Sequence, residues 1–185
     1  MPPIMDRGRR RAQPAPGAER PARSARGLAE RVPPAARPWL LVTVVTLVVV
    51  AIDQLAKNAV ESSIDPGDTQ KLLPGIQLVN TRNRGVAFGF LPGSHIGVTI
   101  LIGVALLVLL AYFARHARQP LIWLPTGMLL GGAIGNIVDR VRADSVTDFI
   151  KLPLGWPPFN LADASITLGI LLLLLVIESS RHRDK

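Results

Sequence analysis

Residues 96–113 read IGVTILIGVALLVLLAYF, a run of eighteen residues without a charged side chain. A helix of that length extends about 27 Å, close to the hydrocarbon thickness of a bilayer. The chain has three more long apolar segments, at residues 39–56, 121–138 and 161–177, of which the first and the last include one acid each. Four apolar segments separated by charged stretches predict an all-α membrane protein with four transmembrane helices.

The composition also favours a membrane protein over a water-soluble domain. Of the 185 residues, 49% are hydrophobic and only 18% are charged, and the mean hydropathy is +0.34. The chain has no cysteine, which excludes disulfides, thiolate zinc sites, iron–sulfur clusters and cysteine nucleophiles. With only three histidines, a His-rich metal cage is not expected either.

Three regions are predicted from the distribution of charge. Residues 1–37 hold nine arginines among many Pro and Ala, so we expect a disordered tail that cannot bury enough apolar surface to fold. Such a tail favours contact with anionic lipid head groups, the alternative being a nucleic-acid-binding arm. Residues 38–178 form the predicted membrane domain, and residues 179–185 a short basic tail. We expect membrane lipids and no nucleic acid as partners.

The orientation in the membrane follows from the basic residues. With four spans, both tails and the loop between the second and third spans lie on one side, which carries fourteen Lys and Arg against seven on the other. The positive-inside rule therefore predicts that both termini are cytoplasmic. The longer loops, about residues 57–95 and 139–160, then face outward.

The first outer loop is too long for a simple connector. Residues 75–80 and 86–90 alternate as short strands do, which predicts a small extracytoplasmic sheet. Residues 55–63 are expected to continue the first span as a short interfacial helix.

Carboxylates at membrane depth are costly and are functional candidates by default. The predicted topology places four of them at the outward ends of helices, and we consider them as one group: Asp53, Asp139, Asp148 and Asp163.

Two interpretations remain open for Asp163 and for Asp148. Asp163 lies three residues after Asn160, which fits a helix cap of the capping-box type. Asp148 lies between apolar residues and belongs either to a surface turn or to a short extended segment with alternate residues turned inward. If the two acids share a partly dry site, one would activate a water while the other, protonated, polarises a carbonyl.

The neighbouring polar residues are consistent with either structural or binding roles. Asn136, Asp139 and Arg140 share one face of the third span, while Gly131 and Gly135 permit close helix packing. Asp139 is expected to be neutralised by Arg140 or Arg142.

Two further groups lie in or beside the first outer loop. Residues 83–88, which include Asn83 and Gly85, form the densest polar cluster of this loop and are typical of a turn. Asp53 and Lys57 are four residues apart, which predicts an ion pair tying the first span to the outer loop.

Other chemistries are less well supported by these residues. A Ser–Lys pair of Ser165 with Lys151, or a carboxylate-only site for Mg²⁺ or Ca²⁺, remains possible. A proton-coupled transporter would place its acids at mid-membrane, and a metal-dependent lipid phosphotransferase would place several on one helix.

Five short segments together resemble the lipoprotein signal peptidase (signal peptidase II) family of membrane aspartic peptidases. These segments are DQLAK at 53–57, NRGVAF at 83–88, GGAIGNIVDR at 131–140, VTDF at 146–149 and FNLAD at 159–163. The resemblance covers residues 38–178 and leaves out the basic tail, whose Arg, Ala and Pro usage is typical of a high-GC bacterium such as an actinomycete.

The resemblance implies that Asp148 and Asp163 are catalytic. It implies substrate-binding roles for Asn83, Gly85, Asn136, Arg140 and Asn160, and structural roles for Asp53, Lys57 and Asp139. The implied substrate is a prolipoprotein whose lipobox cysteine carries diacylglycerol, cut just before that cysteine, without a metal or organic cofactor. The implied location is the bacterial cytoplasmic membrane, with the active site at its extracytoplasmic face.

Overall fold

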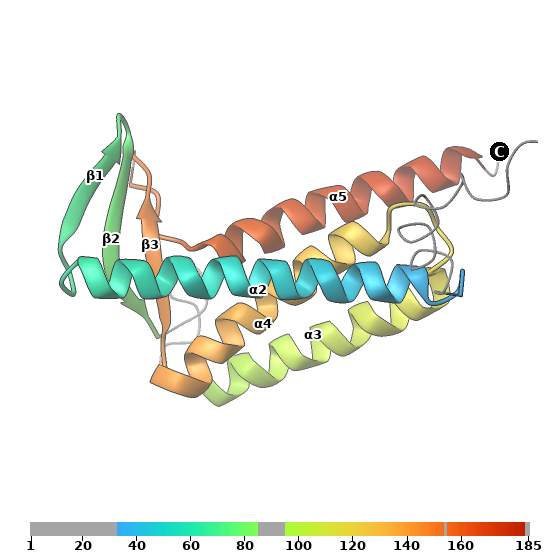
Figure 1. The fold of residues 1–185 in the computed structure, drawn as a ribbon, viewed down its shortest axis with the longest axis horizontal. Helices are drawn as coiled ribbons and strands as arrows, with labels where there is room; N and C mark the ends of the chain where they lie inside the picture. The colour runs from blue at the N-terminus through green and yellow to red at the C-terminus, as the bar shows by residue number, and fades with distance from the viewer. Residues whose placement is uncertain (1–32, 85–94, 154, 184–185) are drawn as a thin grey trace, which may run out of the picture. The chain divides into compact units, whose positions relative to one another are not determined.

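The computed structural model describes residues 33–84, 95–153 and 155–183. The helices and strands all lie in the compact unit Pro34–Lys185 and are drawn in Figure 1. They are, in order, α2 (Arg37–Ser63), β1 (Thr69–Leu73), β2 (Ile76–Asn83), α3 (His95–His116), α4 (Trp123–Ala143), β3 (Val146–Lys151) and α5 (Leu161–Arg183). Three of the predicted apolar segments lie within one helix each, and the one at 121–138 begins two residues before α4, so the mostly helical fold with a small sheet is confirmed.

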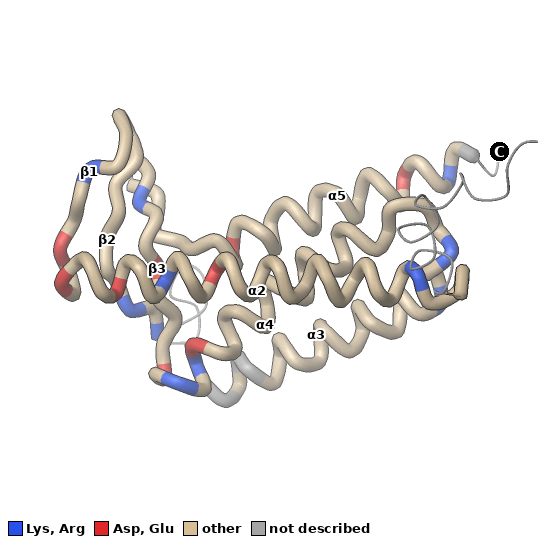
Figure 2. The backbone as a smooth tube through the Cα atoms, in the orientation of Figure 1, with Lys and Arg blue, Asp and Glu red and all other residues tan. Residues whose placement is uncertain are grey.

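The helices are apolar along their length and charged near their ends. Figure 2 shows the Lys, Arg, Asp and Glu residues near the sheet and at the opposite ends of the helices. Two of the described helices, α2 and Leu161–His182 of α5, are long and apolar enough to cross a membrane. Ile100–His116, within α3, is a shorter apolar helix, and four membrane spans remain a prediction.

The first span and the expected interfacial helix form one unbroken helix. Pro38 lies in the first turn of α2, where its missing N–H costs no hydrogen bond. The helix ends where Ile64 turns extended, with φ −130° and ψ 124°. Residues 55–63 are therefore part of α2 itself.

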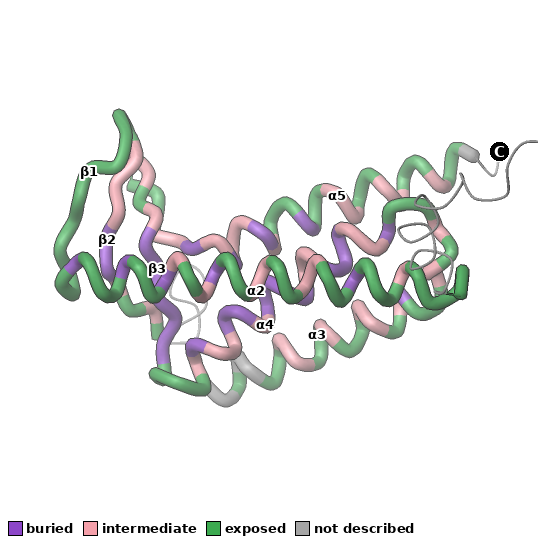
Figure 3. Tube along the Cα trace, viewed as in Figure 1, coloured by how far each residue is buried: buried purple, intermediate pink, exposed green. Residues whose placement is uncertain are grey.

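Large apolar side chains cover much of the outer surface of these helices. Exposed residues line the outer faces in Figure 3, and Leu47, Leu107 and Leu175 are 62%, 68% and 66% exposed. Soluble monomers rarely expose so much contiguous apolar surface, so this surface fits a lipid environment.

Helix α4 contacts α2, α3 and α5, and its glycines allow the close approach. A Cβ at Gly131 would lie 2.6 Å from Cβ of Val49 on α2, and one at Gly132 would lie 2.4 Å from the carbonyl oxygen of Ala162 on α5. The predicted close packing at the small residues of the third apolar segment is confirmed.

The three strands form an antiparallel sheet in the order β1-β2-β3. The strand predicted at residues 75–80 is confirmed as β2, whereas the one predicted at 86–90 lies outside the described residues. The extended segment that was one of two interpretations for Asp148 is confirmed as β3, but burial does not alternate along it, because residues 146–149 are all buried. β3 contacts α2 and α4, and Ile150 pairs with Phe159 in the chain that leads to α5.

Candidate active site

Asp148 and Asp163 line one cavity, although they come from different elements. Asp148 lies on β3 and Asp163 in the first turn of α5. The cavity has a volume of about 710 Å³. Three other predicted site residues line it, namely Asn83, Asn136 and Arg140. Gly85 lies outside the described residues.

The rest of the cavity wall is mostly apolar and includes residues of α3, α4, α5 and the segment before α5. Its side chains include Ile102, Ala133, Trp156, Ile166 and Leu168. The cavity therefore combines two acids and their polar neighbours with a surface on which an acyl chain or an apolar peptide could lie.

The carboxylate of Asp148 is buried and accepts a hydrogen bond on each oxygen. Nδ2 of Asn83 donates to Oδ2 at 2.9 Å, and Nδ2 of Asn160 donates to Oδ1 at 2.7 Å. Asp148 is only 3% exposed, so the interpretation as a surface turn is wrong. Burial raises the pKa of Asp148 to about 6, against the two amide bonds, and the charge of Asp163 adds to the rise.

The structure gives Asp163 both the helix-capping contacts and the place beside a second acid that were considered for it. Asn160 Oδ1 accepts the N–H of Asp163 at 2.9 Å, and Asp163 Oδ2 accepts the N–H of Asn160 at 3.3 Å, which is a capping box with Asp in place of Glu. Asn136 Nδ2 donates to the other oxygen, Oδ1, at 2.8 Å. The residue that caps α5 thus also presents its carboxylate to the cavity.

Asn160 holds both acids from a fully buried position. It is 0% exposed, and its side-chain amide donates to Asp148 and accepts from the backbone of Asp163. Because both ends of the amide are engaged, this geometry fits a positioning residue better than the direct substrate contact implied by the resemblance.

A buried lysine lies next to this group. The ammonium of Lys57 is 2.7 Å from Oδ2 of Asp53, 2.7 Å from Oδ2 of Asp139 and 3.0 Å from Oδ1 of Asn136. The predicted pair of Asp53 with Lys57 is confirmed. The expectation that it ties α2 to the outer loop is wrong, since its other contacts are on α4 and, through the Ala162 N–H to Asp53 at 2.9 Å, on α5.

The ammonium also determines how the Asn136 amide is oriented. A lysine ammonium can only donate hydrogen bonds, so it faces the amide oxygen of Asn136. The NH₂ end of the amide is then directed at Asp163. Lys57 therefore orients the Asn136 amide, and Asn136 in turn donates to Asp163 in the cavity.

Asp139 belongs to this buried group. Sequence reasoning assigned its charge to Arg140 or Arg142; the structure adds an ion pair with Lys57 of α2 at 2.7 Å, while Arg140 also interacts with Asp139 through its charge. Gln54 Nε2 adds a hydrogen bond to Asp139 Oδ1 at 2.8 Å. The Asp139 side chain therefore joins α4 to α2, which favours a structural role.

Sequence reasoning missed a second polar group that joins α2 to the sheet. Arg82 Nη1 lies 3.2 Å from Oε1 of Glu61 and donates to Oγ1 of Thr147 at 2.9 Å, and the Thr147 hydroxyl bonds Glu61. Glu61 follows Asp53 and Lys57 at four-residue spacing, and that spacing was the available signal.

The alternative chemistries find little support among the described residues. Within these ranges, no group of three or more His, Cys, Asp or Glu side chains could hold a metal ion. Ser165 donates its hydroxyl hydrogen to the Met128 carbonyl at 3.0 Å, while Lys151 is exposed on β3, so this serine is not activated by that lysine.

The chain is similar to proteins of one family. The family model described as signal peptidase (SPase) II matches residues 45–178. A lipoprotein signal peptidase of Halothermothrix orenii is 34% identical over 138 residues, covering 74% of this chain and 94% of the relative. One from Paraburkholderia phymatum is 40% identical over 143 residues, covering 74% and 84%.

Solved structures resemble the fold as well. A bacterial membrane enzyme solved by the in meso method is 29% identical with a TM-score of 0.72, covering 78% of this chain and 91% of that one. A second structure of the same description has a TM-score of 0.68 at 30% identity, covering 74% and 91%.

Proposed function

Because the chain belongs to the signal peptidase II family, it is a membrane peptidase that removes the signal peptide from lipoprotein precursors, and we propose that it does so with Asp148 and Asp163 as a catalytic pair. The observation that carries the proposal is that these two carboxyl groups, from β3 and α5, line one cavity. Each is held in place by asparagine side chains.

The environments of the two acids favour different roles. Burial raises the pKa of Asp148 to about 6, and in our proposal Asp148 carries the proton that the pair shares. Both carboxylates accept a hydrogen bond on each oxygen, and Asp163 in addition lies in the first turn of α5, where negative charge is stabilised. In this assignment Asp163 is the base and Asp148 the acid, although a coupled pair titrates as a unit.

The reaction follows from these roles. Asp163 takes a proton from a water molecule, whose oxygen attacks the carbonyl carbon of the scissile peptide bond, while the Asp148 proton hydrogen-bonds the carbonyl oxygen. The tetrahedral intermediate then collapses as the proton gained by the pair passes to the leaving amine nitrogen, and the C–N bond breaks. Water is the nucleophile, and this scheme uses no metal or organic cofactor.

The proposed substrate is a prolipoprotein whose cysteine already carries diacylglycerol, cut just before that cysteine. The apolar wall of the cavity would receive the lipid and the apolar signal peptide. Asn83, Gly85, Asn136 and Arg140 are the proposed peptide-binding residues. We assign Asn160 a positioning role and keep Asp53, Lys57 and Asp139 as structural residues.

We propose that all four helices cross the bacterial cytoplasmic membrane with both termini in the cytoplasm. Asp148 and Asp163 then lie at the extracytoplasmic ends of the helices. A lipid-anchored substrate that diffuses in the outer leaflet would present its scissile bond at this level.

The test compares a diacylglyceryl-modified precursor with the same precursor lacking the lipid, each incubated with the purified full-length protein. We expect cleavage of the modified precursor alone, and loss of cleavage in Asp148→Asn and in Asp163→Asn. Asp144→Asn is the matched control, because Asp144 is an exposed acid in left-handed backbone (φ 53°), a conformation that Asn also adopts readily.

Near-normal turnover by either catalytic variant would refute the assignment of the pair. Equal cleavage of both precursors would refute the substrate assignment. Thermal unfolding of each purified variant separates a chemical defect from a folding defect.

A further inference from the structure

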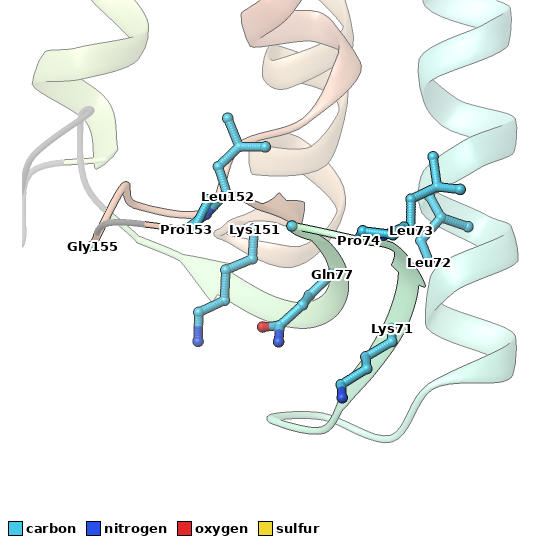
Figure 4. A pocket seen from close by; sticks show the side chains of 10 residues that line it. Lys71, Leu72, Leu73, Pro74, Gln77, Lys151, Leu152, Pro153 and Gly155 are labelled. Carbon is cyan, nitrogen blue, oxygen red and sulfur yellow. The ribbon is translucent and has the colours of Figure 1, made fainter.

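A second cavity lies at the far end of the sheet, away from the two acids. It has a volume of about 740 Å³ and is formed by the β1–β2 hairpin and the segment after β3. Figure 4 shows its lining residues, which include Lys71, Leu72, Leu73, Lys151 and Leu152.

The strand register gives the two faces of the sheet different characters. Lys71 pairs with Gln77, and Gln77 pairs with Lys151, so these three polar residues form one row on one face. In the adjacent row Leu78 pairs with Ile150, and successive residues of a strand point to opposite faces.

The apolar face points toward the helices. Leu78 and Ile150 pack against the cluster of Val60 and Ile64 at the end of α2. The row of lysines therefore faces away from the helices. Figure 4 shows Lys71, Gln77 and Lys151 pointing away from the side on which the helices lie.

Two leucines on the helix side of this hairpin are not covered by the rest of the described chain. Leu72 is 55% exposed and Leu73 is 59% exposed. In a regular strand two adjacent residues would point to opposite faces. The register of β1 shifts between Lys71 and Leu73, and such an irregularity can re-aim a side chain. In Figure 4 both leucines point to the side of the helices, as Leu152 does.

We propose that Leu72 and Leu73 insert into the outer leaflet of the membrane and anchor the free end of the hairpin. The inference rests on the proposed placement of the helices, since the side of the sheet that faces the helices is then the side that faces the bilayer. Like the hairpin, α2 exposes large apolar side chains, among them Leu47 and Leu55.

The charged and aromatic residues near Leu72 and Leu73 are also consistent with contact between the hairpin and the outer leaflet. Lys71 and Lys151 point away from the bilayer, so their charges remain in water or among the head groups. Trp156 follows β3 and is 56% exposed, and tryptophan is enriched at membrane–water interfaces.

The anchor would have a consequence for the active site. The hairpin is continuous with β2, which carries Asn83, and β2 pairs with β3, which carries Asp148. A hairpin fixed at both ends, by α2 and by lipid, holds these strands at a constant depth relative to the outer leaflet.

The experiment uses single-cysteine variants, because the chain has no cysteine of its own. Leu72→Cys, Leu73→Cys, Lys71→Cys and Lys151→Cys each receive a nitroxide spin label, and the labelled full-length protein is placed in lipid nanodiscs. Collision rates are measured with molecular oxygen, which dissolves in lipid, and with a water-soluble nickel chelate. Leu47→Cys, on the apolar surface of α2 and 62% exposed, is the reference for lipid contact.

We expect the ratio of oxygen to nickel collisions at 72 and 73 to exceed that at 71 and 151 by about tenfold, because a charged chelate is excluded from hydrocarbon. Labels at 72 and 73 that meet the chelate as often as those at 71 and 151 would overturn the anchor. If the Leu47 label still reports lipid, only the anchor fails. A water-exposed Leu47 label would overturn the membrane placement together with the anchor.

Discussion

A carboxyl group that is buried, as that of Asp148 is, binds its proton more tightly in the folded protein than in the unfolded chain. Its pKa is raised from 3.8 to about 6, mainly by burial. The stability contributed by this group is therefore fully present below about pH 3.8 and is lost as the pH rises through about 6. Asp148→Asn is neutral at every pH and lacks this loss.

We therefore predict that the stability of the wild type relative to Asp148→Asn falls as the pH rises through this window. The fall should be on the order of 3 kcal/mol, and it is measured by thermal unfolding of both proteins at a series of pH values. Asp65→Asn, which removes an exposed acid, controls for a general effect of charge. A constant difference between wild type and Asp148→Asn across the window would contradict the raised pKa.

Asn160 has two functions that can be separated by mutation. Asn160→Ser keeps an oxygen that can cap α5 but loses the NH₂ group that donates to Asp148. We predict that it loses about twofold to tenfold in kcat, since a hydrogen bond to the neutral acid contributes about 0.5–1.5 kcal/mol, while its unfolding temperature stays near that of the wild type. Asn160→Ala should lose the cap as well, and with it about 1 kcal/mol of stability.

Cleavage assays and thermal unfolding of the two variants measure these effects. An Asn160→Ser protein with normal kcat would show that its amide does not hold Asp148 for the reaction.

Local sequence was enough to find some site residues but not others. Asn160 and Asp163 could be recognised because the capping box depends on a three-residue spacing within one helix. The contact of Lys57 with Asp139 could not be recognised from the sequence, because the two residues are 82 positions apart and meet only when α2 packs on α4. Thr147 was missed for the same reason, as its partners are on other elements.

At the scale of the elements, the glycines of α4 provide the sharpest test of packing. A Cβ at Gly132 would lie 2.4 Å from the Ala162 carbonyl oxygen, whereas one at Gly103 of α3 has nothing within 4 Å. We predict that Gly132→Ala separates α4 from α5, costs about 1–3 kcal/mol and lowers activity, because Asp163 is only one residue beyond Ala162. Both variants add the same methyl group to a helix, so Gly103→Ala is the matched control.

Thermal unfolding and cleavage rates are measured for both glycine variants. If Gly132→Ala behaves like Gly103→Ala, the tight contact between α4 and α5 is not needed for stability or for the site.

The helices were predictable as elements because long apolar segments specify helices in a lipid environment. The continuation of the first span to Ser63 was predicted as well, whereas the start of α4 at Trp123, two residues into its apolar segment, was not. The charges of Asp53 and Lys57 lie inside α2 because they pair with each other and with α4. β1 was not predicted because TQKLL at 69–73 does not alternate, and its pairing with β2 depends on the hairpin rather than on its own pattern.

At the scale of the whole molecule, the catalytic proposal uses only part of the chain. The polar contacts described above that hold the two acids come from residues 57–163. We therefore predict that deletion of residues 1–34 leaves kcat/KM unchanged within about twofold, since no group that stabilises the transition state is removed. The tail is instead proposed to act through its basic residues, each of which contributes about 1 kcal/mol near an anionic membrane surface.

The truncated protein should accordingly reach the membrane in smaller amounts, which is measured as protein in the membrane fraction, while cleavage per mole of purified enzyme is measured separately. A full-length variant with glutamine in place of the tail arginines distinguishes charge from length, and it should reproduce the truncation if charge is the cause. A truncated enzyme that is folded but inactive on a lipidated precursor would show that the tail takes part in catalysis, because recruitment plays no role once enzyme and substrate share one nanodisc.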